Sequence, residues 1–335
     1  MTPRLAISIG DVNGIGPEVI LKTFGHPETF PPCRPVVFGS LACLEWYAER
    51  LGLRVTLKRV TDLQEAQEGV LAVSDDGTAF DAEAVGRPTR QSGAAAFHAF
   101  RRAAEAVRNG ELDALVTAPV SKEAVTLAGV PFRGHTELLG HMCGQTPVMM
   151  LYSGCMRVVL VTTHVPLREV PALITTGNVL RVIRTSARAL RSDFGKTNAR
   201  IAVLALNPHA GDGGVIGWED EEYILPSVRE ARAEGIDAEG PFPSDGFFSA
   251  YRHADYDVVV AMYHDQGLTP FKMRAGGHGV NVTLGLPIVR TSPDHGTAFA
   301  IAGRGEADAS SMAEAVRAAL EILGNRRHAQ GEGER

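Results

Sequence analysis

Short apolar runs alternate with longer amphipathic segments along most of the 335 residues, and this alternation is what most constrains the fold. Runs such as 5–10 and 255–264 have the length and composition of buried strands. Apolar residues recur at helical spacing in the segments between such runs, which are 94–110, 178–195, 219–235 and 310–324. Strands that alternate with helices favour an α/β layered fold.

Composition and charge limit the partners that this chain can have. The net charge is -6 and 21% of residues are charged, which argues against nucleic acid or an anionic membrane surface as the main partner. The N-terminus has no secretory signal pattern, and no apolar run is long enough to span a bilayer. The cysteines show no CxxC spacing, which favours reduced thiols at Cys33, Cys43, Cys143 and Cys155. We therefore expect a soluble, cytoplasmic protein.

The chain contains no low-complexity linker that would separate two consecutive domains. A second domain is therefore expected to be inserted into the first. We predict a discontinuous first domain at 1–130 and 270–325, a second domain at 131–269, and a frayed tail at 326–335.

Three predicted strands each run into a histidine, at His164, His209 and His264. Ligands gather at the carboxyl ends of strands in open α/β sheets, so imidazoles from three such ends can meet at one point. Three neutral imidazoles suit Zn²⁺ or a similar divalent ion and leave positions for substrate or water. The alternative is that each is a hydrogen-bonded structural residue, and residue spacing alone leaves both interpretations open.

Cations and hydrogen-bonding side chains lie on either side of these histidines. They are the imidazole of His135, the hydroxyl of Thr136, the amide of Asn281 and the cations Lys272 and Arg290. Such a set can hold a phosphate together with a carboxylate, since Arg binds anions bidentately and Lys supplies a point charge. The alternative is that the cations are solvated surface residues.

Two glycine-containing loops are candidates for nucleotide binding. The turn at 10–18 lacks the GxGxxG spacing of a Rossmann fingerprint, and a simple tight turn is favoured over an anion site there. The second loop runs from Asp294 through His295, Gly296 and Thr297 to Ala298. It resembles the loop with which isopropylmalate and isocitrate dehydrogenases wrap the adenosine end of NAD.

Seven segments occur in the order typical of one known family: GDVNGIGPEV, VTAPVSKEA, GHTELLG, TTHVPL, LNPHAGDGG, AMYHDQGL and NVTLGLPIVRTSPDHGTA. Together they resemble the 4-hydroxythreonine-4-phosphate dehydrogenase family of vitamin B6 (pyridoxal phosphate) biosynthesis. The resemblance runs from residue 5 to about 310. Val12 and Asn13 stand where many members have Pro-Ala.

The resemblance implies two α/β/α layered domains like those of isopropylmalate dehydrogenase, with the active site in the interdomain cleft. It also implies a homodimer whose metal ligands come from both subunits. His164, His209 and His264 would hold the divalent metal (Zn, Mg or Co), and residues 294–298 the NAD or NADP. The residues that would hold the substrate are His135, Thr136, Lys272, Asn281 and Arg290.

The implied reaction is NAD-dependent oxidation of 4-phosphohydroxy-L-threonine to 2-amino-3-oxo-4-phosphooxybutanoate. This β-keto acid then decarboxylates to 3-amino-2-oxopropyl phosphate. A divalent metal would stabilise the anionic species. Candidates for the general base are Lys272, Asp245 and His135, while Asp265 is a candidate for orienting a metal-bound imidazole.

Other functions remain open at this stage. Some members of the family act on D-threonate or D-erythronate 4-phosphate, and others on a cyclic dihydrodiol. The GHTE segment at 134–137 favours a phosphorylated substrate over the dihydrodiol. From different classes, a zinc hydrolase with three histidine ligands and a non-catalytic binding module are the alternatives.

Overall fold

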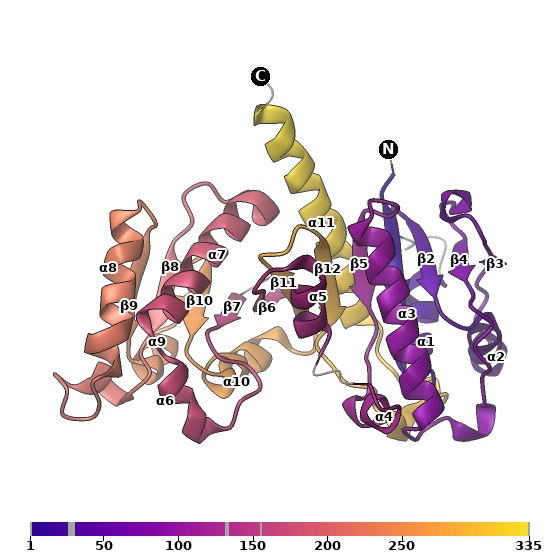
Figure 1. Ribbon diagram of the computed structural model, residues 1–335, viewed down its shortest axis with the longest axis horizontal. Coiled ribbons are helices and arrows are strands. Elements are labelled where there is room, and N and C mark those ends of the chain that lie inside the picture. The colour runs from indigo at the N-terminus through magenta and orange to yellow at the C-terminus, as the bar shows by residue number, and fades with distance from the viewer. Residues whose placement is uncertain (1, 26–30, 131–133, 155, 334–335) are drawn as a thin grey trace. The chain divides into compact units, whose positions relative to one another are not determined.

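The computed structural model describes residues 2–25, 31–130, 134–154 and 156–333, so Cys155 lies outside the described residues. The chain divides into two compact units, each built from two segments of sequence (Figure 1). Unit 1 comprises Met1–Thr146 and Leu286–Gly324. Unit 2 comprises Pro147–Gly285 and Asn325–Arg335.

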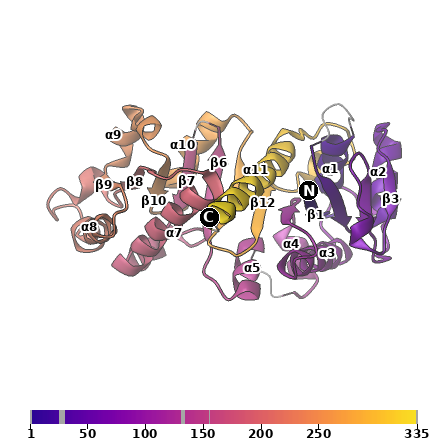
Figure 2. The ribbon, with the colours of Figure 1, turned by 90° about the horizontal axis from the view of Figure 1, so that it is seen from above.

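Unit 1 contains a parallel set of strands in the order β3-β4-β2-β1-β5-β12. The strands are β1 Arg4–Ser8, β2 Arg34–Phe38, β3 Leu57–Arg59, β4 Leu71–Ser74, β5 Ala114–Thr117 and β12 Val289–Pro293. The helices are α1 Gly16–Phe24, α2 Leu41–Leu51, α3 Arg90–Arg108, α4 Lys122–Leu127, α5 His135–Cys143 and the first part of α11 Ser310–Gly333. Figure 2 shows α1 and α3 on opposite sides of β1, which gives this unit its three layers.

Unit 2 contains the strand order β11-β6-β7-β10-β8-β9, in which β6 runs antiparallel to both of its neighbours. The other neighbouring pairs are parallel. The strands are β6 Val148–Ser153, β7 Met156–Leu160, β8 Ile201–Leu204, β9 Ala238–Phe242, β10 Val258–Ala261 and β11 Val280–Leu284. The helices are α6 Val170–Leu173, α7 Thr176–Phe194, α8 Leu225–Ala233, α9 Ser244–Ser249 and α10 His264–Ala275. In Figure 2, α7 and α10 lie on opposite sides of these strands.

Local sequence signals account for the ends of the long helices. Thr89 and Ser92 form a reciprocal capping box at the start of α3, and the side chain of Thr175 caps α7. α7 ends at Phe194 and is capped by Gly195, whose φ of 64° is left-handed and suits glycine. A threonine thus marks the start of both helices, and a glycine marks the end of α7.

Both units are discontinuous, whereas the prediction had a continuous second domain, and the boundaries fall later in the chain than predicted. They lie after Thr146 rather than after 130, and before Leu286 rather than before 270. The helix α5 stays with unit 1 because its first residue, His135, contacts Phe100 of α3 with ring centroids 4.4 Å apart. Helix α10 stays with unit 2, since Gly267 lies so close to β7 that an added Cβ would be 2.6 Å from Val158. Lys272, on α10, therefore belongs to unit 2.

The prediction of a frayed tail from residue 326 is wrong for residues 326–333, because α11 continues to Gly333. Arg326 is held by the buried carboxylate of Asp193 on α7, with a contact of 2.8 Å. Asn325 donates a hydrogen bond to the carbonyl of Asp193. These long-range contacts extend the helix beyond the point where its apolar pattern ends.

The apolar helices and the cysteines were both subjects of the sequence analysis. In the ranges that the structure describes, no helix is long and apolar enough to cross a membrane. Cys33, Cys43 and Cys143 are free thiols.

Candidate active site

His164 and His264 follow two neighbouring parallel strands of unit 2, β7 and β10. The backbone pairing of these strands continues past their ends, where the amide of Thr162 donates to the carbonyl of Met262 over 3.1 Å. Each histidine stands two residues beyond this aligned pair. The two imidazole rings consequently lie with their centroids 5.8 Å apart.

Asp265 orients one of the two imidazoles. Its Oδ1 lies 2.8 Å from Nδ1 of His264. A carboxylate can only accept, so Nδ1 carries the proton and Nε2 keeps the lone pair that a metal ion needs. A cavity of about 340 Å³ opens beside this pair and is lined in part by His164, Leu167, Tyr263 and His264. Two neutral imidazole nitrogens are donors that a divalent cation prefers, and Asp265 would orient one of them.

His209 follows β8, the other parallel neighbour of β10. It begins a run of backbone with positive φ, in which His209 has 54°, Ala210 55° and Asp212 46°. Residues other than glycine rarely adopt a positive φ, and backbone strain of this kind is typical of functional loops. The loop is thus held in an unusual shape after the third strand-end histidine.

The three histidines do not converge on one point within this chain as described. Over residues 2–25, 31–130, 134–154 and 156–333, no three His, Cys, Asp or Glu side chains form a group that could hold a metal ion. The structure brings together His164 and His264, and the assignment of His209 as a third ligand stays a prediction.

Two buried polar residues that sequence reasoning missed shape this edge of unit 2. Asp220 is fully buried, and its carboxylate accepts hydrogen bonds from the amides of Leu206 and Asn207, just before His209. Gln266 accepts from the amide of Met262 and donates to the carbonyl of Ala205. It thus links the ends of β10 and β8. The acidic run at 219–222 resembled an ordinary helix start, which concealed the role of Asp220.

Unit 1 contains a buried cation next to a half-buried imidazole. Arg290, on β12, is 2% exposed, and its Nη2 donates to Oγ1 of Thr117 over 2.6 Å and contacts Nδ1 of His135 at 3.2 Å. β12 pairs with β5, which carries Thr117, and this pairing explains the convergence. The sequence gives no sign of Thr117, because a threonine in a strand is unremarkable.

The electrostatics of this pair favour an anion. Burial lowers the pKa of Arg290 to about 9, so the guanidinium stays charged at neutral pH. Burial first, and the charge of Arg290 second, hold the pKa of His135 well below its usual value. His135 is therefore neutral. Since Arg290 can only donate, Nδ1 of His135 accepts and its Nε2 carries the proton. An anion here would meet one full charge and an imidazole N–H.

The remaining predicted substrate and base residues are distributed over several elements. Thr136 is the second residue of α5 in unit 1. Asn281 lies on β11, and its Oδ1 is buried without a hydrogen-bond partner. Lys272 and Asp245 are exposed residues of α10 and α9.

The loop at 294–298 packs against the first glycine-rich turn. The amide of Ile15 donates to the carbonyl of Thr297 over 2.9 Å, and a Cβ at Gly14 would lie 2.8 Å from that carbonyl. The amides of Asp11, Asn13 and Gly14 are also bonded within the chain. The turn is thus a packing element with these amides occupied, as the tight-turn interpretation predicts.

His295 has a polar atom without a hydrogen-bond partner in the 294–298 loop. Its Nδ1 lies 3.1 Å from the carbonyl of Gly296, which can only accept, so this nitrogen carries the proton. Nε2 is then an acceptor, and it is buried without a hydrogen-bond partner. A buried acceptor of this kind suits a ligand that brings a hydroxyl or an amino group.

Comparison with known proteins identifies the family. The family model for the pyridoxal phosphate biosynthetic protein PdxA matches residues 31–319. The chain belongs to this family.

Individual PdxA-family relatives match nearly the whole chain. The 4-hydroxythreonine-4-phosphate dehydrogenase of Prosthecochloris aestuarii is 46% identical, with 96% of this chain and 97% of the relative covered. The D-threonate 4-phosphate dehydrogenase of Cupriavidus necator is 42% identical, with 97% and 98% covered. The crystal structure of the 4-hydroxythreonine-4-phosphate dehydrogenase of Klebsiella pneumoniae matches with a TM-score of 0.85 and 37% identity, covering 96% and 98%.

Membership of the PdxA family decides whether the chain is an enzyme or a binding module. The chain is an enzyme, a dehydrogenase that oxidises a CH–OH group. The predictions of the family and of an α/β fold are confirmed. The zinc hydrolase and the non-catalytic binding module are not supported.

Proposed function

We propose that this PdxA-family dehydrogenase oxidises 4-phosphohydroxy-L-threonine with NAD and a divalent metal. The product is 2-amino-3-oxo-4-phosphooxybutanoate, which loses CO₂ to give 3-amino-2-oxopropyl phosphate in vitamin B6 biosynthesis. The observation that carries the proposal is the buried Arg290 guanidinium beside the imidazole of His135. A buried cation next to a neutral imidazole N–H is a group of donors that suits a phosphate.

The residues proposed to bind the substrate have complementary roles. Arg290 and His135 would donate to the phosphate, with Thr136 at the first turn of α5 as a further hydroxyl donor. The amide of Asn281, with its buried and unpartnered Oδ1, would accept from the substrate's amino group. Lys272 would supply a positive charge for the carboxylate.

The metal proposal assigns His164, His209 and His264 as ligands. Two observations support it: the ring centroids of His164 and His264 lie 5.8 Å apart, and the carboxylate of Asp265 orients His264. When bound, a divalent cation supplies a Lewis acid that lowers the pKa of the substrate hydroxyl. Zn, Mg and Co are the candidate ions.

The cofactor proposal assigns residues 294–298 to the adenosine end of NAD. The unpartnered Nε2 of His295 supports it, because it offers an acceptor to the cofactor. When bound, NAD would supply the hydride acceptor for the oxidation. NADP remains a candidate alternative in the same loop.

The chemistry requires one base and then one acid. The carbinol carbon loses a hydride and its hydroxyl loses a proton, which gives the β-keto acid. The bond to the carboxylate then breaks, CO₂ leaves, and the remaining carbanion carbon takes up a proton. Lys272 and Asp245 are the candidates to accept and return that proton, since both are exposed ionisable residues of unit 2.

We also propose a homodimer. Large apolar side chains are exposed on the segments that follow His164 and His209, namely Leu167, Val215, Ile216 and Trp218. Exposed apolar groups of this kind are typical of interaction surfaces. A partner that covers them would approach the histidine-bearing loops. Analytical ultracentrifugation tests the stoichiometry: a dimer is expected, and a monomer would refute this part of the proposal.

D-threonate 4-phosphate is a second candidate substrate, because a relative 42% identical carries that name. The test is a comparison of kcat/KM for 4-phosphohydroxy-L-threonine, D-threonate 4-phosphate and D-erythronate 4-phosphate, each with NAD and with NADP. We expect the highest kcat/KM for 4-phosphohydroxy-L-threonine with NAD. A higher kcat/KM for D-threonate 4-phosphate or D-erythronate 4-phosphate, which lack the amino group, would favour the alternative function as a dehydrogenase of these acids.

A further inference from the structure

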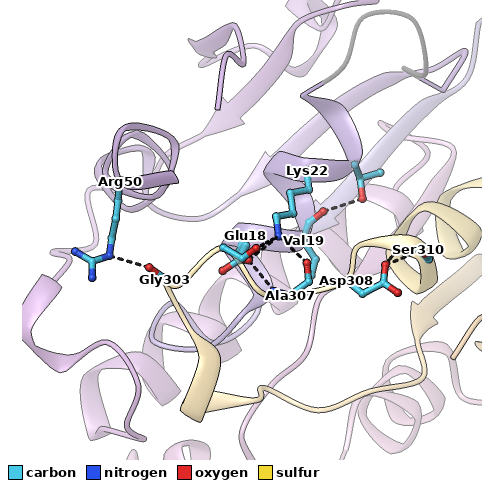
Figure 3. A network of polar contacts seen from close by, with 10 residues as sticks. Glu18, Val19, Lys22, Arg50, Gly303, Ala307, Asp308 and Ser310 are labelled. Carbon is cyan, nitrogen blue, oxygen red and sulfur yellow. Dashed lines mark hydrogen bonds and ion pairs between the residues drawn. The ribbon is translucent and has the colours of Figure 1, made fainter. Parts of the chain in front are cut away.

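The segment between β12 and α11 is mostly irregular, and its second half is bonded to side chains from α1 and α2 (Figure 3). Lys22 and Glu18 of α1 contact residues 305 and 307, and Arg50 of α2 donates to the carbonyl of Gly303 over 2.8 Å. Irregular backbone usually exposes its carbonyls to water. Here three alternate carbonyls, at 303, 305 and 307, are bound by cationic side chains.

Lys22 is the centre of this network. Its Nζ lies 2.8 Å from Oε1 of Glu18, 2.8 Å from the carbonyl of Gly305 and 2.7 Å from the carbonyl of Ala307. An ammonium group has three N–H donors, so these contacts use its full capacity. The side chain of Lys22 is 23% exposed, which is low for a lysine.

Glu18 completes the connection from within the protein. Its side chain is fully buried, and Oε1 also accepts from the amide of Ala307 over 2.9 Å. A buried ion pair contributes little net stability compared with apolar residues of similar volume. What this pair does provide is a fixed position for residues 305–307.

The same helix holds the first half of the segment. The amide of Ile15, immediately before α1, donates to the carbonyl of Thr297, and Gly14 leaves just enough room for that carbonyl. The turn that leads into α1 thus contacts the first half of the segment, and Glu18 and Lys22 of α1 contact the second half. α1 and the turn before it therefore hold Thr297 and Ala307 at a fixed separation.

We propose that Lys22 and Glu18 are positioning residues, which hold the 294–307 segment in the conformation that binds the dinucleotide cofactor. The inference rests on the proposed assignment of residues 294–298 to NAD. A loop that is fixed before binding loses less conformational entropy when the ligand arrives, so affinity rises without any additional contact. Neither residue needs to touch the cofactor for this effect.

The test compares Lys22→Met with wild-type enzyme and with Lys58→Met. Lys58 is a matched control, since it also pairs with a glutamate, Glu65, at 3.1 Å, but on the exposed side of unit 1. NADH affinity is measured by fluorescence titration, and amide hydrogen exchange is followed over 303–307. We expect Lys22→Met to raise the Kd for NADH about tenfold and to speed exchange at Ala307. KM for the phosphorylated substrate should stay unchanged, and Lys58→Met should match wild type.

A second variant separates positioning from stability. Lys22→Met leaves the Glu18 carboxylate buried without its cation, which lowers the melting temperature. In Glu18→Gln/Lys22→Met the charge is gone, and the amide oxygen of Gln can still accept from Ala307. This double variant should recover most of the lost melting temperature while the Kd for NADH stays raised.

The outcomes distinguish the inference from the function on which it rests. Wild-type affinity for NADH in the double variant, together with fast exchange at 303–307, would overturn the positioning role. Unchanged exchange in Lys22→Met would overturn the claim that Lys22 fixes the segment. Absence of NADH binding to the wild-type enzyme would refute the proposed cofactor, and this inference with it.

Discussion

The guanidinium of Arg290 donates a hydrogen bond to Nδ1 of His135, and this contact determines which nitrogen of the imidazole carries the proton. An arginine offers donors alone, so the proton of His135 is on Nε2. The pair therefore presents a charge and an N–H group from two different elements, β12 and α5. Arg290 is buried and His135 is half-buried with a buried Nε2, and low exposure strengthens their interaction with an anion.

Replacement of Arg290 should remove phosphate recognition. We expect Arg290→Met to raise KM for the phosphorylated substrate about 100-fold, because hydrogen bonds to a charged group contribute about 1.5–3 kcal/mol each. Inorganic phosphate should raise the melting temperature of the wild type and have no effect on the variant. The control is Arg102→Met, which removes a half-buried arginine bonded to Ser74 in the same unit. An equal phosphate-induced shift in Arg290→Met would contradict the assignment.

The imidazole of His135 should make stability depend on pH. Its pKa lies well below the value of about 6.5 in an unfolded chain. Below pH ~6.5 the unfolded state binds a proton that the folded state does not, so the free energy of unfolding decreases as pH falls. The contribution has a slope of up to about 1.4 kcal/mol per pH unit.

Urea unfolding of wild type and His135→Gln between pH 5 and about 7.5 measures this slope. The variant should show a weaker decrease in stability toward low pH. His253, whose pKa burial also lowers, contributes equally to both proteins. Parallel stability curves would show that His135 takes up a proton in the folded state as readily as in the unfolded one.

Asp265 should matter for metal affinity through His264. Because its carboxylate fixes the proton on Nδ1, Asp265→Asn should weaken metal binding by about 10–100-fold. Competition with a chromogenic chelator measures the affinity. Asp76→Asn is a matched control, since Asp76 contacts Nδ1 of His98 at the same distance of 2.8 Å, in unit 1. If Asp265→Asn loses no more metal affinity than Asp76→Asn, Asp265 does not orient a metal-binding histidine.

Lys272 can be separated from the metal ligands. Lys272→Met should abolish turnover and leave the metal content intact, because the side chain stands eight residues after His264 on α10. In a helix this spacing is about 12 Å along the axis. Single-turnover kinetics and metal analysis on the same preparation test this. Near-normal turnover would leave Asp245 as the candidate base.

Much of the fold followed from local sequence patterns. Strand-end histidines were recognisable because parallel strands direct their carboxyl ends to one edge, and His164 and His264 lie together for this reason. The central turns of α3 and α7 were predictable from their apolar spacing, but both helices begin earlier than predicted, at Arg90 and Thr176, because Thr89 and Thr175 cap them. These features depend on residues close in sequence.

The features that sequence reasoning missed depend on distant contacts. The carboxylate of Asp193 extends α11 by binding Arg326, 133 residues away. Thr117 joins the predicted anion site only because β5 and β12 are neighbours. Glu18 resembled an ordinary acidic residue at a helix start, yet it is buried against residue 307. No local pattern reports on such contacts.

The most direct test of the central claim is NADH formation from 4-phosphohydroxy-L-threonine, followed by absorbance at ~340 nm with and without a chelator. We expect a signal that the chelator abolishes and that added divalent metal restores. A signal that persists in the chelator would contradict the metal requirement, and no signal with any phosphorylated hydroxy acid would contradict the proposed function as a whole.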